Sequence, residues 1–346
     1  MELNSYLLVS LKGQEVCAYP SRGVPSSLWH YFPSRGRGFI SSLLKILEAV
    51  HFDRVMWPLV VNPLKRNGVL ISDLIMELAE DLQELEELDL AVCWPHSSRS
   101  VARVYGYLIN KKAKTIAGYL KGASGVEDVE CLDNEIEAVC KLEHKAVTFR
   151  YPRFHKRAVF GATKLFARFD LLPISKEPEW SLESWGDSIW GFKKEFARGT
   201  YKHVPVAEVA NLKWVQLFCS SCNEKVVAAF CKSLKECDFV SICATHGDMA
   251  CHNFRYDGEK TWIFDWESYT EEGPILVDEL TVFMCVRRFR LGWSVARTFA
   301  DLERNYPISN PKTRHEVIQA MAFILAYKLS MSDVLGVEMV KYANAG

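Results

Sequence analysis

The chain has 346 residues, of which 49% are hydrophobic and 25% charged, a balance typical of a globular protein with room for two cores. Its 42 lysines and arginines nearly cancel its 43 aspartates and glutamates, so the composition disfavours nucleic acid or an anionic membrane as the main partner. No apolar run has the length of a membrane span and the first residues lack the layout of a secretory signal, so we expect a cytoplasmic protein without an integral membrane segment.

Eleven cysteines are scattered mostly through apolar segments, which favours reduced, mostly buried thiols over a disulfide framework. Cys219 and Cys222 form one C-x-x-C pair, which raises the alternative of a zinc or redox site. The cysteines that follow do not form the second tight pair that a structural zinc site needs. We therefore predict that no zinc is bound.

Residues 1–87 form the first predicted segment, an accessory segment that closes with an amphipathic helix. In "ISDLIMELAEDLQELEEL", which covers residues 71–88, apolar residues recur at near-helical spacing with acidic residues between them. The residues expected on the apolar face are Leu74, Met76, Leu78, Leu82 and Leu85.

Residues 88–172 are expected to form a small β-rich lobe with one helix. Three strand-like runs, "LDLAVCW", "VARVYGYLI" and "KTIAGYLK", are separated by "PHSSRS" and "NKKA", which predicts an antiparallel meander. The segment "EDVECLDNEIEAVCKLE" has helical apolar periodicity, and two further strands are predicted in "AVTFRY" and "ATKLFARFDLLP".

Residues 173–346 are expected to form a larger, mainly helical lobe, with the hinge near residues 171–178. A helix in "NEKVVAAFCKSLKE" leads to the apolar run "FVSICA", and the chain from about residue 276 to its end has mostly helical patterns. The sequence therefore predicts an α+β protein with two lobes and an accessory N-terminal segment.

The stretch "HGDMACHNF" at residues 246–254 is followed by "FRYDGEKTWIFDWE", which contains a strong hairpin signal at Asp-Gly. If Tyr256 pairs with Thr261 across the loop "DGEK", Asn253 falls opposite Phe264 and becomes a neighbour of Asp265. An amide oxygen and a carboxylate side by side are hard oxygen ligands of the kind that Mg²⁺ takes.

The two motifs resemble the catalytic and metal-binding loops of the protein-kinase-like superfamily. In the aminoglycoside phosphotransferase and choline kinase branch these motifs commonly have the sequences H-G-D-x-x-x-x-N and I-D-W-E. This chain has "HGDMACHN" and "FDWE" at the corresponding positions. The resemblance implies ATP and Mg²⁺ as cofactors, Asp248 as the catalytic base, and Asn253 and Asp265 as the metal ligands. The alternative is a hairpin with acidic groups nearby by chance.

The same resemblance implies a lysine on the third strand of the small lobe and a glutamate on the next helix, and Lys121 and Glu135 stand at these positions. A solvated lysine and an exposed helix residue are the alternative. The turn that would cover the phosphates contains no glycine, unlike the protein-kinase pattern. Its Ser97, Ser98 and Arg99 are candidate phosphate contacts, with a plain polar turn as the alternative.

Only "WESYTEEGPILV" separates Asp265 from Asp278, too short a segment for the activation loop of a protein kinase. The resemblance implies that Asp278 supports the catalytic loop. Glu267 is expected either to lie behind the metal ligands or to contact the metal occasionally. The expected acceptor is a hydroxyl of a small molecule or glycan.

A looser resemblance connects the chain to bacterial cell-envelope kinases of the lipopolysaccharide type, which implies peripheral contact with a glycolipid. Trp180, Trp185 and Trp190 are either a sugar-stacking surface or helix core. A pseudokinase or nucleotide-binding regulator, and a protein-directed kinase effector, are the alternative functions.

Overall fold

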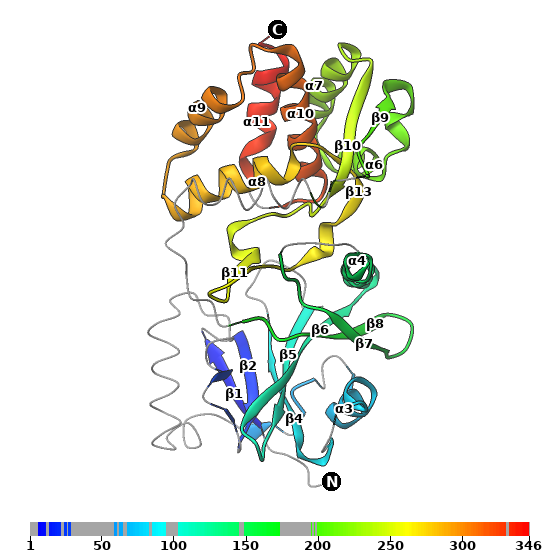
Figure 1. Cartoon of the computed structure of the whole chain (residues 1–346), viewed down its shortest axis with the longest axis vertical. Coiled ribbons are helices and arrows are strands. Elements are labelled where there is room, and N and C mark those ends of the chain that lie inside the picture. The colour runs from blue at the N-terminus through cyan, green and yellow to red at the C-terminus, as the bar shows by residue number, and fades with distance from the viewer. Residues whose placement is uncertain are drawn as a thin grey trace. The chain divides into compact units, whose positions relative to one another are not determined.

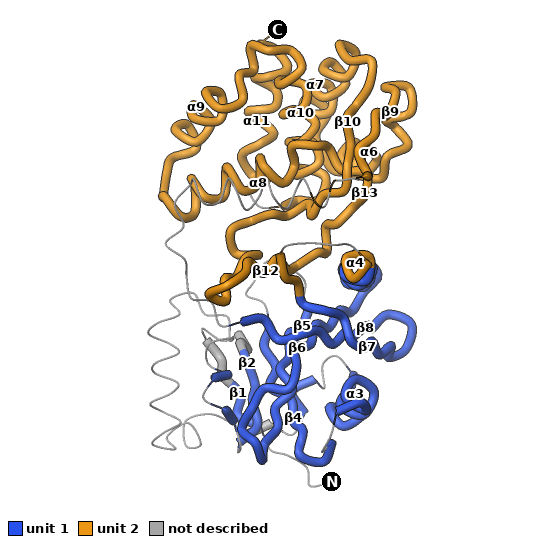
Figure 2. The backbone as a smooth tube through the Cα atoms, in the orientation of Figure 1, with its two compact units in different colours: residues 1–140, 152–174 blue, residues 141–151, 175–346 orange. Residues whose placement is uncertain are grey.

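The computed structural model of the protein divides into two compact units (Figure 2). Unit 1 comprises Met1–Cys140 and Pro152–Ile174, and unit 2 comprises Lys141–Tyr151 and Ser175–Gly346. The structure describes residues 6–11, 14–21, 24–25, 27–28, 59–60, 62–64, 68–82, 85–94, 103–144, 149–173, 195, 197, 199–329 and 332–345. The domain boundaries expected at residues 87 and 172 stay predictions.

Unit 1 is built on an eight-stranded sheet of order β3-β1-β2-β4-β5-β6-β8-β7, in which all neighbouring strands are antiparallel (Figure 1). The strands are β1 (Tyr6–Leu11), β2 (Gln14–Pro20), β3 (Leu59–Val60), β4 (Leu88–Cys93), β5 (Arg103–Asn110), β6 (Thr115–Ser124), β7 (Phe154–Val159) and β8 (Lys164–Phe169). Strand β2 pairs with β4, with Cys17 opposite Cys93, so the sheet continues from the predicted meander into the N-terminal segment.

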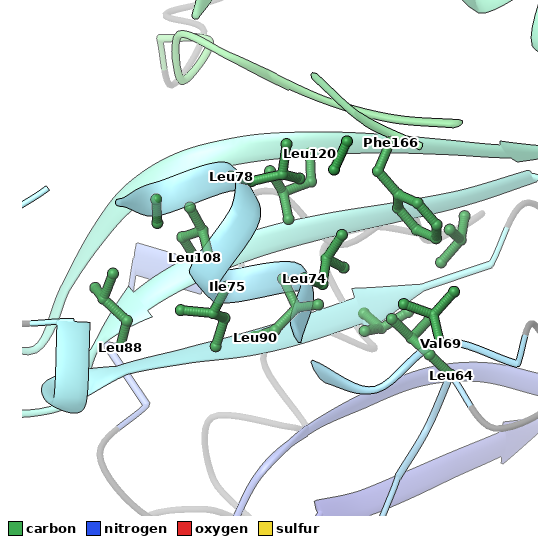
Figure 3. Packing of buried hydrophobic residues seen from close by; sticks show 14 of the residues in the cluster. Leu64, Val69, Leu74, Ile75, Leu78, Leu88, Leu90, Leu108, Leu120 and Phe166 are labelled. Atoms are coloured by element: carbon green, nitrogen blue, oxygen red, sulfur yellow. The ribbon is translucent and has the colours of Figure 1, made fainter. Parts of the chain in front are cut away.

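One face of this sheet is covered by helix α3 (Ile71–Ala79), which packs Leu74, Ile75 and Leu78 against the strands (Figure 3). The helix is shorter than predicted, because residues 85–87 form a separate 3₁₀ turn. Met76 was predicted on the apolar face but is 54% exposed. Met76 is two residues after Leu74 and therefore points to roughly the opposite side of the helix, whereas Leu78, four residues after Leu74, points to the same side as Leu74.

The opposite face of the sheet carries Lys121, because successive side chains of β6 alternate and Leu120 belongs to the α3 side. Tyr119 lies two residues earlier on the Lys121 face, where its ring stacks with that of Tyr105 at a centroid distance of 6.2 Å. Helix α4 (Val126–Glu143) follows β6 directly, as predicted. Its buried apolar positions include Leu132, Ile136, Val139 and Leu142.

Unit 2 is mainly helical, and several of its helices begin at the cap residues that the sequence supplies. Asn223, Ser294 and Asn310 each accept a hydrogen bond from the backbone N–H three residues later, which satisfies one free donor of the first turn. The helices are α6 (Lys213–Ser221), α7 (Glu224–Lys235), α8 (Val277–Cys285), α9 (Val295–Asn305), α10 (Pro311–Ala326) and α11 (Ser332–Ala343), with 3₁₀ turns η4 (Val206–Asn211), η5 (Cys251–Asn253) and η6 (Trp266–Ser268) and a π turn η7 (Val286–Arg290).

Among its described residues, unit 2 also contains two small sheets. The first has the order β13-β10-β9, with β9 (Lys202–Pro205), β10 (Phe239–Thr245) and β13 (Thr270–Pro274). The second is the hairpin of β11 (Phe254–Tyr256) and β12 (Thr261–Ile263). Strand β10 is buried along most of its length and leads directly into the loop of residues 246–253.

One strand of the sheet was missed for a physical reason. Strand β7 was not predicted, because its sequence "FHKRAV" is basic and its side chains are mostly not buried at the edge of the sheet. Of the segment "AVTFRY", where a further strand was predicted, the structure describes residues 149–151, and there Arg150 forms an isolated bridge with Trp262 of the hairpin. Within the described part of the chain, none of the helices combines the length and apolarity that crossing a membrane requires.

Candidate active site

The hairpin of unit 2 brings Asn253 and Asp265 together. Its register pairs Tyr256 with Thr261, as the sequence predicts. Beyond the last ladder pair, the N–H of Phe264 donates to the carbonyl oxygen of Asn253 at 3.2 Å. Because Asp265 is the next residue, it leaves the hairpin beside Asn253, and the predicted juxtaposition is confirmed.

The turn of the hairpin is stabilised by the Asp257 carboxylate. It accepts the N–H groups of Glu259 at 2.9 Å and Lys260 at 2.8 Å, and the indole N–H of Trp262 at 2.8 Å. The Lys260 N–H, the Trp262 indole and the nearby Arg150 guanidinium hold the pKa of Asp257 well below its usual range. These hydrogen bonds therefore stabilise the register of the hairpin from within its turn.

Arg150 is a supporting residue that the sequence did not reveal. Its N–H donates to the carbonyl of Thr261 at 2.8 Å, and its carbonyl accepts the N–H of Ile263 at 2.8 Å. Its guanidinium also pairs with Asp257 at 2.9 Å. The segment after α4 thus adds a third piece of extended chain beside β12, and no sequence signal marks a contact across more than a hundred residues.

Asp265 has a left-handed backbone conformation, with φ 69° and ψ 56°. A residue with a side chain adopts this conformation at a cost, and such residues concentrate at functional sites. The next residue, Trp266, is fully buried and its indole N–H donates to the Ile263 carbonyl at 3.1 Å. This anchor fixes the sharp turn of the main chain at Asp265, directly after β12.

The start of the 246–253 loop is held by Asp278, in the first turn of α8. Its two carboxylate oxygens accept the backbone N–H groups of His246 at 3.1 Å and Gly247 at 3.0 Å. Asp278 is 2% exposed, so these charge-assisted hydrogen bonds form away from water. The predicted supporting role of Asp278 is confirmed.

His246 joins the loop to the residue before Asp265. Its Nδ1 accepts the N–H of Asp248 at 3.3 Å, and its Nε2 lies 3.1 Å from the carbonyl oxygen of Phe264. Because a carbonyl can only accept, this contact requires the hydrogen on Nε2, while Nδ1 accepts through its lone pair. The ring is fully buried with its centroid 4.4 Å from that of Trp266, which fixes its orientation.

Gly247 is required by the backbone. It has φ 89°, and a Cβ at this position would overlap the carbonyl oxygen of Ser268 and lie 2.8 Å from the Ser268 Cβ. A glycine therefore lets the loop pass directly over the turn that follows Asp265.

Asn253 is oriented so that its oxygen is available to a cation. Its amide nitrogen donates to the backbone carbonyl of Asp248 at 2.8 Å, which leaves the side-chain Oδ1 as the remaining polar atom. Asn253 is 1% exposed and Asp248 7% exposed. An amide oxygen next to the Asp265 carboxylate is a donor set that fits Mg²⁺.

In unit 1, Lys121 and Glu135 form a buried ion pair. The Nζ atom lies 2.9 Å and 2.7 Å from the two carboxylate oxygens, and the side chains are 7% and 1% exposed. The alternative of a solvated lysine and an exposed glutamate is therefore wrong. The pair joins β6 to α4 in the order and spacing that the sequence predicts.

The other predicted contacts lie outside the described residues. They are Ser97, Ser98 and Arg99 of the glycine-free turn, and the tryptophans Trp180, Trp185 and Trp190. The eleven cysteines are all free thiols, of which Cys17, Cys93, Cys243, Cys251 and Cys285 are buried.

Comparison with known proteins gives matches in structure alone. No family model and no curated protein sequence matches the chain. The structure is similar to a thermostable mutant of the aminoglycoside phosphotransferase APH(4)-Ia in ternary complex with AMP-PNP and hygromycin B, with a TM-score of 0.50 and 12% identity over 80% of this chain and 97% of that chain. The same enzyme with ADP and hygromycin B gives a TM-score of 0.49 at 12% identity, over 80% and 97% of the two chains.

A mutant of the aminoglycoside 2'-phosphotransferase-IIIa with GDP gives a TM-score of 0.44 at 10% identity, over 80% of this chain and 97% of that chain. The likeness to the AMP-PNP complex spans nearly that whole enzyme. The likeness covers a sheet with the antiparallel strand order β4-β5-β6-β8-β7, in which helix α4 follows β6 in the described part of the chain. The chain therefore has the α+β, protein-kinase-like fold of the aminoglycoside phosphotransferases.

Proposed function

We propose that this protein is an ATP-dependent phosphotransferase that moves the γ-phosphate of ATP to a hydroxyl group of a small molecule or a glycan sugar. The observation that carries the proposal is the hairpin register, which places Asn253 beside Asp265 at the end of a loop that contains Asp248. Phosphoryl transfer depends on such positioning and on neutralised charge more than on covalent steps by the protein.

Asn253 and Asp265 are the proposed Mg²⁺ ligands. The donor orientation supports this role, because the Asn253 amide nitrogen donates to the Asp248 carbonyl and the amide oxygen therefore faces away from that contact. When bound, Mg²⁺ would neutralise charge on the phosphate oxygens of the nucleotide. The left-handed backbone of Asp265 also supports this role, because such strained conformations concentrate at functional sites.

Asp248 is the proposed base. In the reaction, the acceptor hydroxyl oxygen forms a bond to the γ-phosphorus while the bond to the bridging oxygen of ADP breaks. The hydroxyl proton passes to a carboxylate oxygen of Asp248, and from there to solvent. The loop is suited to this role because its backbone is fixed by Asp278 at one end and by the Asn253 amide at the other.

Lys121 is the proposed contact for the nucleotide phosphates, with Glu135 holding the ammonium group in place. The bidentate geometry and burial of the pair support this role. Ser97, Ser98 and Arg99 stay candidate phosphate contacts on sequence grounds.

The proposed phosphate acceptor is a hydroxyl group on a small molecule or a glycan. The similar APH(4)-Ia structure holds an ATP analogue and hygromycin B, which supports a nucleotide and a small acceptor as the substrates of this fold. The narrower hypothesis of an envelope glycan, with peripheral contact to a glycolipid, rests on sequence resemblance.

The proposal is tested with Asp248→Asn, which keeps the size of the side chain. ADP release is measured with aminoglycosides, choline-type amines, nucleosides, heptoses and envelope glycans as acceptors. We expect turnover to fall by about 10²- to 10⁴-fold, the usual contribution of a general base, while MgADP affinity is unchanged. The matched control is Glu259→Gln at the exposed hairpin turn, which should leave both unchanged.

Unchanged turnover in Asp248→Asn contradicts the proposed mechanism. Binding of MgATP without any Asp248-dependent turnover supports the alternative of a nucleotide-binding regulator. Phosphate that appears on added protein and on none of the small acceptors supports the alternative of a protein-directed kinase.

A further inference from the structure

A second, partly buried ion pair joins the sheet of unit 1 to α4. The Nε atom of Arg103, the first residue of β5, lies 2.7 Å from Oδ1 of Asp128 in the first turn of the helix. The arginine side chain is 4% exposed and the aspartate 21%. The sequence does not predict this pair, because an arginine at the end of a strand is usually exposed and its pattern does not reveal that it is buried.

Arg103 and Lys121 project from the same face of the sheet. Strands β5 and β6 pair with Tyr105 opposite Lys121 and Arg103 opposite Ala123. Side chains two residues apart on a strand share a face, so the two cations stand on adjacent strands, one diagonal step apart.

Their partners share one side of α4. Asp128 and Glu135 are seven residues apart, which is close to two full helical turns. The helix therefore presents two carboxylates in line to two cations in line, and each carboxylate meets one cation at 2.7 Å. Another ion pair of α4 is exposed to solvent. The side chains of Arg157 and Asp133 are 60% and 48% exposed, and their charged atoms are 3.4 Å apart.

We propose that Arg103 and Asp128 form a positioning pair that fixes the rotation and depth of α4, so that Glu135 meets Lys121. One ion pair leaves a helix able to turn about the contact, whereas two pairs separated by two turns define its orientation. Arginine suits the task because its planar guanidinium loses less freedom per hydrogen bond than a lysine ammonium. The consequence for nucleotide binding rests on the proposed function, but the placement of Lys121 does not.

The placement is measured by chemical labelling of lysines in the full-length protein without nucleotide. A brief pulse of acetic anhydride is followed by peptide mass spectrometry, with the exposed Lys112 and Lys114 as internal references. Asp128→Asn removes the negative charge of the pair and keeps the size of the side chain. We expect Lys121 labelling to rise about tenfold, within the range of coupling between residues that share a network.

The matched control is Asp133→Asn, which removes the exposed pair on the same helix. It should leave Lys121 labelling unchanged. Arg103→Lys, which keeps the charge on a less rigid group, should give an intermediate rise and serves as the test if Asp128→Asn fails to fold. Thermal melting of each variant shows whether the whole unit has been destabilised.

A double-mutant cycle separates positioning from general support. In the Glu135→Gln background Lys121 has already lost its anion, so adding Asp128→Asn should produce no further rise. If the proposed function holds, Asp128→Asn also weakens MgADP binding by about tenfold, while Asp133→Asn does not.

The proposal is overturned if Lys121 labelling is equal in Asp128→Asn and Asp133→Asn, or if Asp128→Asn raises it equally in both backgrounds. A rise in Lys121 labelling without any loss of MgADP affinity upholds the positioning pair and counts instead against the nucleotide role of Lys121.

Discussion

The two units fix their charged groups in different ways. In unit 1, Lys121 is fixed by another side chain, the carboxylate of Glu135 at 2.7 Å. In unit 2, the loop around Asp248 is fixed through its backbone, since Asp278 accepts two main-chain N–H groups and Asn253 donates to a main-chain carbonyl. Unit 1 should therefore be sensitive to the removal of charge, and unit 2 to changes that alter the backbone.

The largest expected effect separates stability from function in unit 1. Lys121→Met leaves Glu135 buried without its cation and should cost about 3–5 kcal/mol of unfolding free energy, measured by urea denaturation. Combining it with Glu135→Leu removes both charges and should restore most of that stability, because well-packed apolar pairs replace buried ion pairs at little cost.

MgADP binding should be lost in the single and the double variant alike. A double variant that is as unstable as Lys121→Met would show that the unpaired charge of Glu135 is not what destabilises the single variant.

The backbone of unit 2 is tested by Gly247→Ala. The left-handed φ and the overlap with Ser268 should together cost about 2–5 kcal/mol, the sum of backbone strain and overpacking. Gly258→Ala is the matched control, because it has a left-handed φ of 107° with nothing within 4 Å of the added Cβ. It should cost only about 1–2 kcal/mol. Equal losses in thermal or urea unfolding would mean that the close approach to Ser268 is unimportant.

Asp278→Asn has a smaller expected effect. One oxygen still accepts a backbone N–H, while the new amide group meets the other N–H, so the loss should be about 1.5–3 kcal/mol, as for hydrogen bonds to a charged group. Turnover should fall more than stability alone explains, because the loop that contains Asp248 loses an anchor. Glu271→Gln, at a surface pair with Lys141 3.6 Å away, should change stability by less than about 1 kcal/mol. Full turnover in Asp278→Asn would contradict the supporting role.

The smallest effect is the pH response of the hairpin turn. Because the pKa of Asp257 is lowered in the folded protein, its contribution is present above the unfolded value of about 4 and is lost as the pH falls through the folded pKa. Trp262 reports the change, since its indole donates to Asp257. Its fluorescence should shift only as the pH falls well below about 4, and this shift should disappear in Asp257→Asn and persist in Glu259→Gln. If the fluorescence shift had the same size in Asp257→Asn, it would be caused by the titration of another group.

The hairpin and the loop were predictable because their interactions are local. Asp257 and Gly258 specify the turn, the turn specifies the register, and the register places Asn253 beside Asp265 within about a dozen residues. Asp278 was expected to support the loop from the resemblance alone, and the structure supplies the reason in its two backbone hydrogen bonds.

The sequence by itself determined the meander, α4 and the hairpin, since each depends on periodicity or turn chemistry within a short stretch of chain. Only the tertiary structure decided that β2 joins β4, that the segment of Arg150 joins the hairpin, and that Arg103 meets Asp128. These contacts pair residues that local patterns do not connect. Their stability comes from burial and from backbone partners that exist only after the chain has folded.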